Sequence, residues 1–255
     1  MNYSKIIVGA ALLTASSVAL ALPYNSGRPY SGNFNNGSGS EDSLQTILNE
    51  NFNNDSGDIE INAFSDQSNV AAWTLADAAG SRVYTIDILT GATGKLGIYS
   101  LSSGLEYDFS LVGNLNNYDP NSSLSFTITS GGSLKVSDTK VLDGFGQQFG
   151  FYWENSGNTY YTEDDKNNGN VRALTYMIDS GTDWNIGDVP GDGSGGVTSG
   201  NDDWVIAFED WNDNDYQDAV FFISDISAVP EPSILVLFGL GLAGMGFATR
   251  RRNKL

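Results

Sequence analysis

Five carboxylates lie within ten residues near the C-terminal end of the chain, between two apolar runs. The five are Glu209, Asp210, Asp213, Asp215 and Asp218. No Lys, Arg or His stands among them, and like charges so close together destabilise one another unless a cation neutralises them. Outside a cell Ca²⁺ suits this task, because it binds six to eight oxygens from carboxylates, carbonyls and water. This stretch is therefore a candidate calcium site, with Ca²⁺ as its cofactor.

The spacing of the acids indicates which of them bind the ion. Asp213 and Asp215 offer oxygens at i and i+2, and Asp218 adds one at i+5. The stretch is not an EF-hand loop, because Asp218 stands where that loop needs Gly. We expect Asp213, Asp215 and Asp218 as ligands, with Glu209 or Asp210 completing the shell, since neighbours on a strand point to opposite faces. The alternative is a solvated hairpin tip that binds nothing specific.

Two other kinds of chemistry compete with calcium binding. Aromatic side chains could form a platform on which sugar rings stack; the candidates are Trp153, Tyr160, Tyr161 and Trp184. Paired carboxylates could hydrolyse glycosides, either Glu209 with Asp210 or Glu163 with Asp164. A catalytic pair must lie ~5–9 Å apart across a cleft, whereas neighbours on one strand diverge. No Ser, Cys or His nucleophile motif is present either, so we expect no enzymatic activity.

The composition limits the partners. The 255 residues carry 31 acidic and 12 basic side chains, a net charge of −19, with no Cys and no His. Such a surface repels nucleic acid and anionic lipid and favours divalent cations or neutral partners. Without His or Cys, the usual zinc, iron and copper ligand sets are depleted.

The N-terminus has the pattern of a secretory signal peptide. Lys5 precedes a short apolar run at 6–13, and Ala19-Leu20-Ala21 has the small-x-small form of a signal-peptidase site. We therefore assign residues 1–21 to a signal peptide cut after Ala21. Residues 22–41 are rich in Pro, Gly, Ser and Asn, and we expect them to form a flexible leader.

The C-terminus combines three features in order. Pro230-Glu231-Pro232 precedes an apolar run at 233–249, and Arg250, Arg251 and Arg252 follow. A 17-residue helix is about 26 Å long, just short of a ~30 Å hydrocarbon core. The segment 229–255 resembles the PEP-CTERM sorting signal of Gram-negative exported proteins. The resemblance implies a transmembrane sorting helix, an exosortase as processing partner, and transient residence in the inner membrane.

Between these ends the sequence predicts one all-β domain over 42–228. A helix is expected at 42–51, because Leu44, Ile47 and Leu48 share one face. Short alternating runs separated by Gly, Asn, Asp and Ser predict an antiparallel β-sandwich, jelly-roll-like. The expected strands are 59–64, 82–89, 95–100, 105–112, 124–129, 134–136, 148–153, 159–162, 172–178, 204–208 and 219–226. The Gly-rich stretch 181–201 is expected to be poorly ordered without a ligand.

The body resembles a bacterial domain-of-unknown-function family found in exported proteins and repeat adhesins. The resemblance rests on Phe208-Glu209-Asp210, a short acidic turn, and Asp215-Tyr216-x-Asp218. This chain departs from the family at Trp211-Asn212, where Gly is usual, and at Arg172, where His is expected. The resemblance implies placement at a cell surface or in a matrix and binding of a cation.

These observations predict an exported, non-enzymatic protein of the cell surface or extracellular matrix, stabilised by Ca²⁺. Signal peptidase and an exosortase are its expected processing partners, and extracellular polysaccharide is a candidate ligand. A Ca²⁺-dependent carbohydrate-binding module is the alternative, and a glycoside hydrolase is a third, weaker one.

We predict that the mature protein begins near Leu22 and has lost the chain beyond about Pro232, because both ends carry processing signals. Intact-mass measurement on the exported protein tests this. A final product that still contains Arg250 to Leu255 would contradict removal of the tail.

Overall fold

The computed structural model describes residues 25, 27–30, 41–52, 61–91, 93–113, 123–178, 183–184, 197–198 and 202–229. They belong to one compact unit, Pro23–Glu231. The predicted signal peptide, the sorting helix, part of the leader and most of the 181–201 stretch lie outside the described residues. In the described ranges no helix has the length and apolar character needed to cross a membrane.

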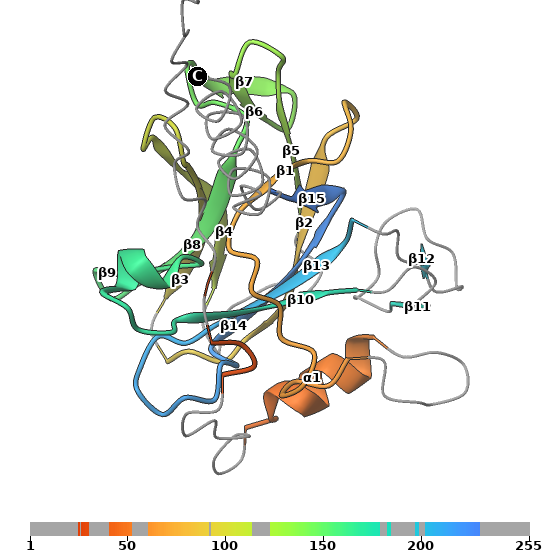
Figure 1. The fold of residues 1–255 in the computed structure, drawn as a ribbon, viewed down its shortest axis with the longest axis vertical. Helices are drawn as coiled ribbons and strands as arrows, with labels where there is room; N and C mark the ends of the chain where they lie inside the picture. The colour runs from red at the N-terminus through yellow and green to blue at the C-terminus, as the bar shows by residue number, and fades with distance from the viewer. Residues whose placement is uncertain are drawn as a thin grey trace, which may run out of the picture. The chain divides into compact units, whose positions relative to one another are not determined.

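Two antiparallel sheets form the body of this unit (Figure 1). The first has six strands: β1 (Trp73–Leu75), β3 (Gly94–Ser100), β4 (Glu106–Gly113), β8 (Phe149–Asn155), β9 (Asn158–Tyr161) and β15 (Ile226–Ala228). Their order is β15-β1-β8-β3-β4, and β9 also pairs with β8. A single-turn helix, η1 (Asp164–Asn167), follows β9.

The second sheet has seven strands. They are β2 (Ser81–Ile88), β5 (Ser123–Ile128), β6 (Leu134–Val136), β7 (Thr139–Leu142), β10 (Ala173–Met177), β13 (Trp204–Phe208) and β14 (Ala219–Ser224). Their order is β10-β13-β14-β2-β5-β6-β7. Two short strands, β11 (Asp183–Trp184) and β12 (Val197–Thr198), pair separately.

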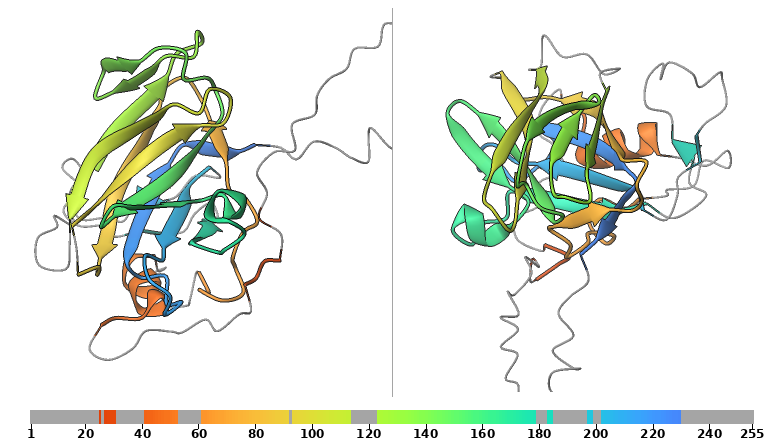
Figure 2. Two further views of the ribbon diagram at one scale, coloured as in Figure 1. Left: turned by 90° about the vertical axis from the view of Figure 1, so that its left-hand side faces the viewer. Right: turned by 90° about the horizontal axis from the view of Figure 1, so that it is seen from above.

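The part of the seven-stranded sheet formed by β10, β13, β14 and β2 is covered on both faces, which explains why β13 and β14 are almost wholly apolar (Figures 1 and 2). Ile206, Phe208 and Phe221 belong to the large core cluster that includes side chains of the six-stranded sheet. The alternate residues, Val205 and Phe222 among them, pack in a second cluster with the helix α1 (Leu44–Asn51). Side chains alternate across a strand, so a sheet buried on both faces needs continuous apolar runs.

The helix forms where the sequence predicts it. The side chain of Ser43 caps its first turn by accepting a hydrogen bond from the backbone N–H of Thr46 at 3.2 Å. Leu44, Ile47 and Leu48 are buried on one face. The predicted antiparallel sandwich with one short N-terminal helix is therefore confirmed.

Three details differ from the prediction. Residues 61–64, the described part of the expected strand 59–64, form a turn. The expected strand 219–226 is two strands, because Asp225 adopts a left-handed φ of 59° and ends β14. Strands β1 and β7 were not predicted, because each is only three or four residues long and lacks a run of alternation.

Part of the predicted flexible leader is packed against the body. The backbone N–H of Asn25 donates to the carbonyl of Asn69 at 2.9 Å, and its side chain donates to the carbonyl of Thr162 at 2.8 Å. The guanidinium of Arg28 is buried and donates to the carboxylate of Asp164 at 3.1 Å. These contacts anchor Asn25 and Arg28 although the composition of the leader resembles that of a linker.

Replacement of Phe221 by Ala should lower the free energy of unfolding by about 3–5 kcal/mol, because it leaves a cavity in the core. The ring of Phe221 is fully buried and lies 5.6 Å, centroid to centroid, from that of Trp153. Phe64→Ala is the control, because Phe64 is 46% exposed and surface changes cost within about 0.5 kcal/mol. Denaturant unfolding compares the two; equal effects would contradict this description of the core.

Candidate functional site

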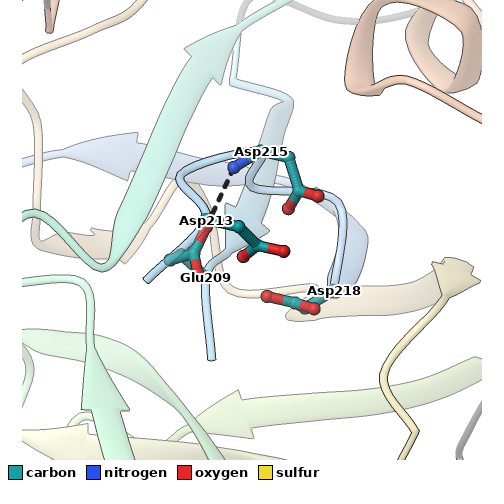
Figure 3. A group of neighbouring side chains, drawn as sticks. All are labelled: Glu209, Asp213, Asp215 and Asp218. Carbon is teal, nitrogen blue, oxygen red and sulfur yellow. Dashed lines mark hydrogen bonds between the residues drawn. The ribbon is translucent and has the colours of Figure 1, made fainter. Parts of the chain in front are cut away.

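The acidic turn, residues 209–218, connects two strands of the central hairpin. The ladder between β13 and β14 ends at the pair Phe208 and Ala219, so the turn is held at a fixed separation. Figure 3 shows four of its carboxylates gathered around one region. They belong to Glu209, Asp213, Asp215 and Asp218, and one oxygen from each lies within 4.8 Å of the others. Two oxygens that both bind Ca²⁺ at 2.3–2.6 Å can be at most about 5 Å apart, so the group fits one calcium ion.

The carboxylate of Glu209 fixes the backbone of the turn through hydrogen bonds. Its side chain is fully buried, and its Oε1 accepts a hydrogen bond from the backbone N–H of Trp211 at 3.0 Å. Its Oε2 accepts from the backbone N–H groups of Asp215 at 3.0 Å and Tyr216 at 3.4 Å. One carboxylate thereby holds both sides of the loop, and its remaining lone pairs are available to an ion.

The carboxylate of Asp210, the neighbour of Glu209, makes its contacts outside the four-carboxylate group. Its carboxylate accepts a hydrogen bond from the side-chain amide of Asn155, which in turn donates to Thr90 Oγ1 at 2.6 Å. Its backbone N–H donates to Asp218 Oδ2 at 2.7 Å. Of the two adjacent acids proposed to complete the shell, Glu209 lies in the four-carboxylate group and Asp210 does not.

Asp215 carries an unsatisfied acceptor. The residue is 3% exposed, and among the described residues nothing donates a hydrogen bond to its Oδ1. Left-handed residues bend the chain on either side of it, with φ of 62° at Asn214 and 56° at Tyr216. A buried carboxylate oxygen without a partner is costly, and a cation held by the same four side chains would supply one.

Burial and the charges of neighbouring acids disfavour the ionised form of three carboxyl groups in the turn. Burial, followed by the charge of Asp213, raises the pKa of Glu209 above its ordinary value and that of Asp215 to about 6. Burial and the charge of Asp210 likewise raise the pKa of Asp218. Three carboxyl groups thus bind protons more tightly in the folded protein than they would in the unfolded chain.

Arg172, the basic residue beside the turn, does not neutralise the negative charge of the carboxylates. Arg172 donates to the carbonyl of Trp211 and, at 2.7 Å, to Oδ1 of Asn212, and its guanidinium lies 5.5 Å from the ring centre of Tyr160. Within the described part of the chain, no ion pair involves an acid of the turn. Arg172 therefore fixes the backbone of the turn and leaves its carboxylates to another cation.

The described aromatic residues of the proposed sugar platform, Trp153, Tyr160 and Tyr161, do not form one exposed surface. Trp153 is fully buried in the core, and its indole lies over Gly94 of the adjacent strand, where a Cβ would collide with the ring. Tyr160 and Tyr161 are half-buried; Tyr160 donates to the carbonyl of Asp210, and Tyr161 to Glu106 at 3.0 Å. The side chain of Trp184 lies outside the described residues. A platform that includes Trp153 is thus wrong.

Three of the four acids in the proposed hydrolytic pairs, Glu209, Asp210 and Asp164, make contacts that support the fold. Glu209 binds backbone N–H groups, and Asp210 binds Asn155. Asp164 forms an ion pair with the buried Arg28. Burial raises the pKa of Glu163.

Sequence reasoning did not foresee the supporting residues Asn155 and Arg172. Asn155 lies 55 residues before Asp210 in the sequence and reaches it through sheet packing. No spacing pattern in a single sequence signals such a contact. The exposure of Trp211, at 69%, was equally unforeseen, because an aromatic residue beside a strand usually packs inward.

Comparison with known proteins identifies the C-terminal segment. Residues 228–252 match the PEP-CTERM protein-sorting motif, which includes Pro230, Glu231, Pro232 and the arginines. These residues lie outside the described part of the structure. The resemblance of the body to a domain-of-unknown-function family stays a prediction, and no curated protein matches the chain.

A Chromobacterium violaceum lectin, solved in complex with alpha-methyl-fucoside, is among the similar structures. It is 11% identical, and the match covers 64% of this chain and 100% of the lectin chain at a TM-score of 0.30. So distant a likeness supports no conclusion about function.

We predict that the metal-free protein becomes less stable as the pH rises from about 4, the ordinary carboxyl pKa, through the value of about 6 at Asp215. Over this interval the folded protein binds more protons than the unfolded chain, so its free energy of unfolding falls. The raised pKa values of Glu209 and Asp218 act in the same direction. Melting temperatures in chelator at matched ionic strength test this.

The matched variant for that measurement is Asp215→Asn, which removes the charge and keeps the shape. Its metal-free melting temperature should exceed that of the wild type at pH 8, and the difference should shrink toward pH 5. A wild-type curve that rises between pH 5 and 8 would contradict the description of the turn.

Proposed function

We propose that this chain is an exported, non-enzymatic protein of the cell surface or extracellular matrix, sorted by an exosortase and stabilised by Ca²⁺. The PEP-CTERM sorting motif at 228–252 is the observation that carries the proposal. It supports export and processing by an exosortase, and the pattern of residues 1–21 supports entry by signal peptidase. In this proposal residues 42–228 form the domain that functions after export, and the segment 229–255 is a sorting signal.

Calcium stabilisation is supported by the geometry of the acidic turn. Four carboxylates approach within the limit for one ion, and an oxygen of Asp215 is buried without a partner. The chain has no Cys, so a disulfide cannot reinforce the exported domain, and a bound ion can do so by mass action. The ion would link the two ends of a turn whose strands lie at the centre of the sheet.

A binding role without catalysis agrees better with this turn than glycoside hydrolysis does. A hydrolase needs two carboxyl groups facing each other across a cleft. The carboxylate of Glu209 instead accepts hydrogen bonds from the backbone of the turn, and Asp210 and Asp164 bind Asn155 and Arg28. The net charge of −19 disfavours nucleic acid as a partner and leaves extracellular polysaccharide and cations as suitable ones.

Millimolar Ca²⁺ should raise the melting temperature of the purified full-length protein. Extracellular sites often have Kd of ~10⁻⁴–10⁻³ M, so about 10 mM Ca²⁺ is roughly ten to a hundred times Kd. The stabilisation RT ln(1 + [Ca]/Kd) is then about 1.4–2.7 kcal/mol, which corresponds to about 3–10 °C for a domain of this size. Scanning calorimetry in CaCl₂ and in chelator measures this rise in melting temperature.

The double variant Asp213→Ala, Asp215→Ala should lose this calcium-dependent rise and keep its metal-free fold, because removing the two charges relieves repulsion. Asp66→Ala is the control, since Asp66 is an acid outside the turn and should leave the rise unchanged. Equal melting of the wild type in both buffers would mean that the turn is only a solvated hairpin tip.

A further inference from the structure

Trp211 is an exposed indole inside the acidic turn. It is 69% exposed, more than any other large apolar side chain that the structure describes. It stands two residues from Glu209 and two from Asp213. Consecutive Cα atoms are 3.8 Å apart, so the Cα of Trp211 lies within about 8 Å of both these ligand residues. An indole so placed can contact the same small molecule that contacts the ion.

The backbone of Trp211 is held at both of its polar groups. Its N–H donates to Glu209 Oε1 at 3.0 Å, and its carbonyl accepts from the guanidinium of Arg172. Arg172 also binds the side chain of the next residue, Asn212, at 2.7 Å. The indole therefore extends from a backbone that is already ordered. A ligand that stacks on it would cause little further loss of conformational entropy in the loop.

The four-carboxylate group is open on one side. Glu209 and Asp215 are buried, whereas Asp213 is exposed. An ion in this group would be held by the protein from the buried side and would face solvent beside Asp213. Ca²⁺ takes six to eight oxygens, so four carboxylates binding through one oxygen each would leave two or more positions for water or a ligand.

We propose that Ca²⁺ and Trp211 together form a binding site for neutral saccharides. Two neighbouring hydroxyl oxygens of the sugar would replace water on the solvent side of the ion, and the apolar face of the ring would stack on the indole. Neutral sugars fit because the surrounding acids repel anions, and hydroxyl oxygens suit a hard cation. This inference rests on the proposed calcium site and names its ligand class. It uses Trp211 in place of the platform that included Trp153.

Saturation-transfer NMR on the full-length protein tests the proposal with three probes. They are methyl α-mannoside, methyl β-galactoside, and a fully O-methylated methyl α-glucoside that keeps the ring but has no hydroxyl group. At least one of the first two should bind in millimolar Ca²⁺ and not in chelator, and the O-methylated probe should not bind. Trp211→Ala should weaken binding by about tenfold or more, the effect of removing a central aromatic contact. Trp211→Phe should retain part of it.

Calcium-dependent melting of the same samples separates this proposal from the one on which it rests. Trp211→Ala should keep the full calcium-dependent rise, because its side chain is not a ligand, and Phe64→Ala should match the wild type in both measurements. A wild type that shows the rise but binds neither hydroxylated glycoside would overturn the saccharide site and leave the calcium site standing. Binding that persists in chelator, or that is unchanged in Trp211→Ala, would also overturn it. A wild type without the rise would overturn both.

Discussion

The close approach of like charges at the end of a rigid hairpin is the constraint on which the rest of this structure depends. Strands β13 and β14 are packed on both faces, so their ends cannot move apart to relieve repulsion between Glu209 and the aspartates that follow it. The energy that buries Phe208 and Phe221 therefore also holds the carboxylates together. The packing of the core and the gathering of the carboxylates are therefore properties of the same hairpin.

The sequence was sufficient for the regular parts of this fold because they follow from periodicity. Apolar runs such as 204–208 predicted strands, and the spacing of Leu44, Ile47 and Leu48 predicted the helix. Short elements were missed, because three residues such as Trp73–Leu75 cannot display alternation. For the candidate site, the spacing of the acids predicted Asp213, Asp215 and Asp218 as members of the group and left the choice between Glu209 and Asp210 open. The contact between Asp210 and Asn155, which sets Asp210 apart from the other acids, forms only when two sheets pack.

Arg172 shows how one side chain can shape an acidic site without neutralising it. Its guanidinium binds the carbonyl of Trp211 and the amide of Asn212, both of them uncharged, and lies over the ring of Tyr160. The turn gains a fixed backbone while its net negative charge persists. The planar guanidinium of Arg offers several N–H donors in a fixed geometry, so one side chain can hold both of these groups of the turn.

The contacts of Asn25 and Arg28 have a consequence for the order in which the chain can fold during export. Asn25 binds Thr162, and Arg28 reaches Asp164, so both contacts close loops of more than 130 residues. Strand β2 similarly lies between β5 and β14, and β14 begins only at Ala219. A chain that crosses a membrane from its N-terminus thus delivers its first segments long before their partners arrive. Until the last strands have crossed, the sandwich cannot close.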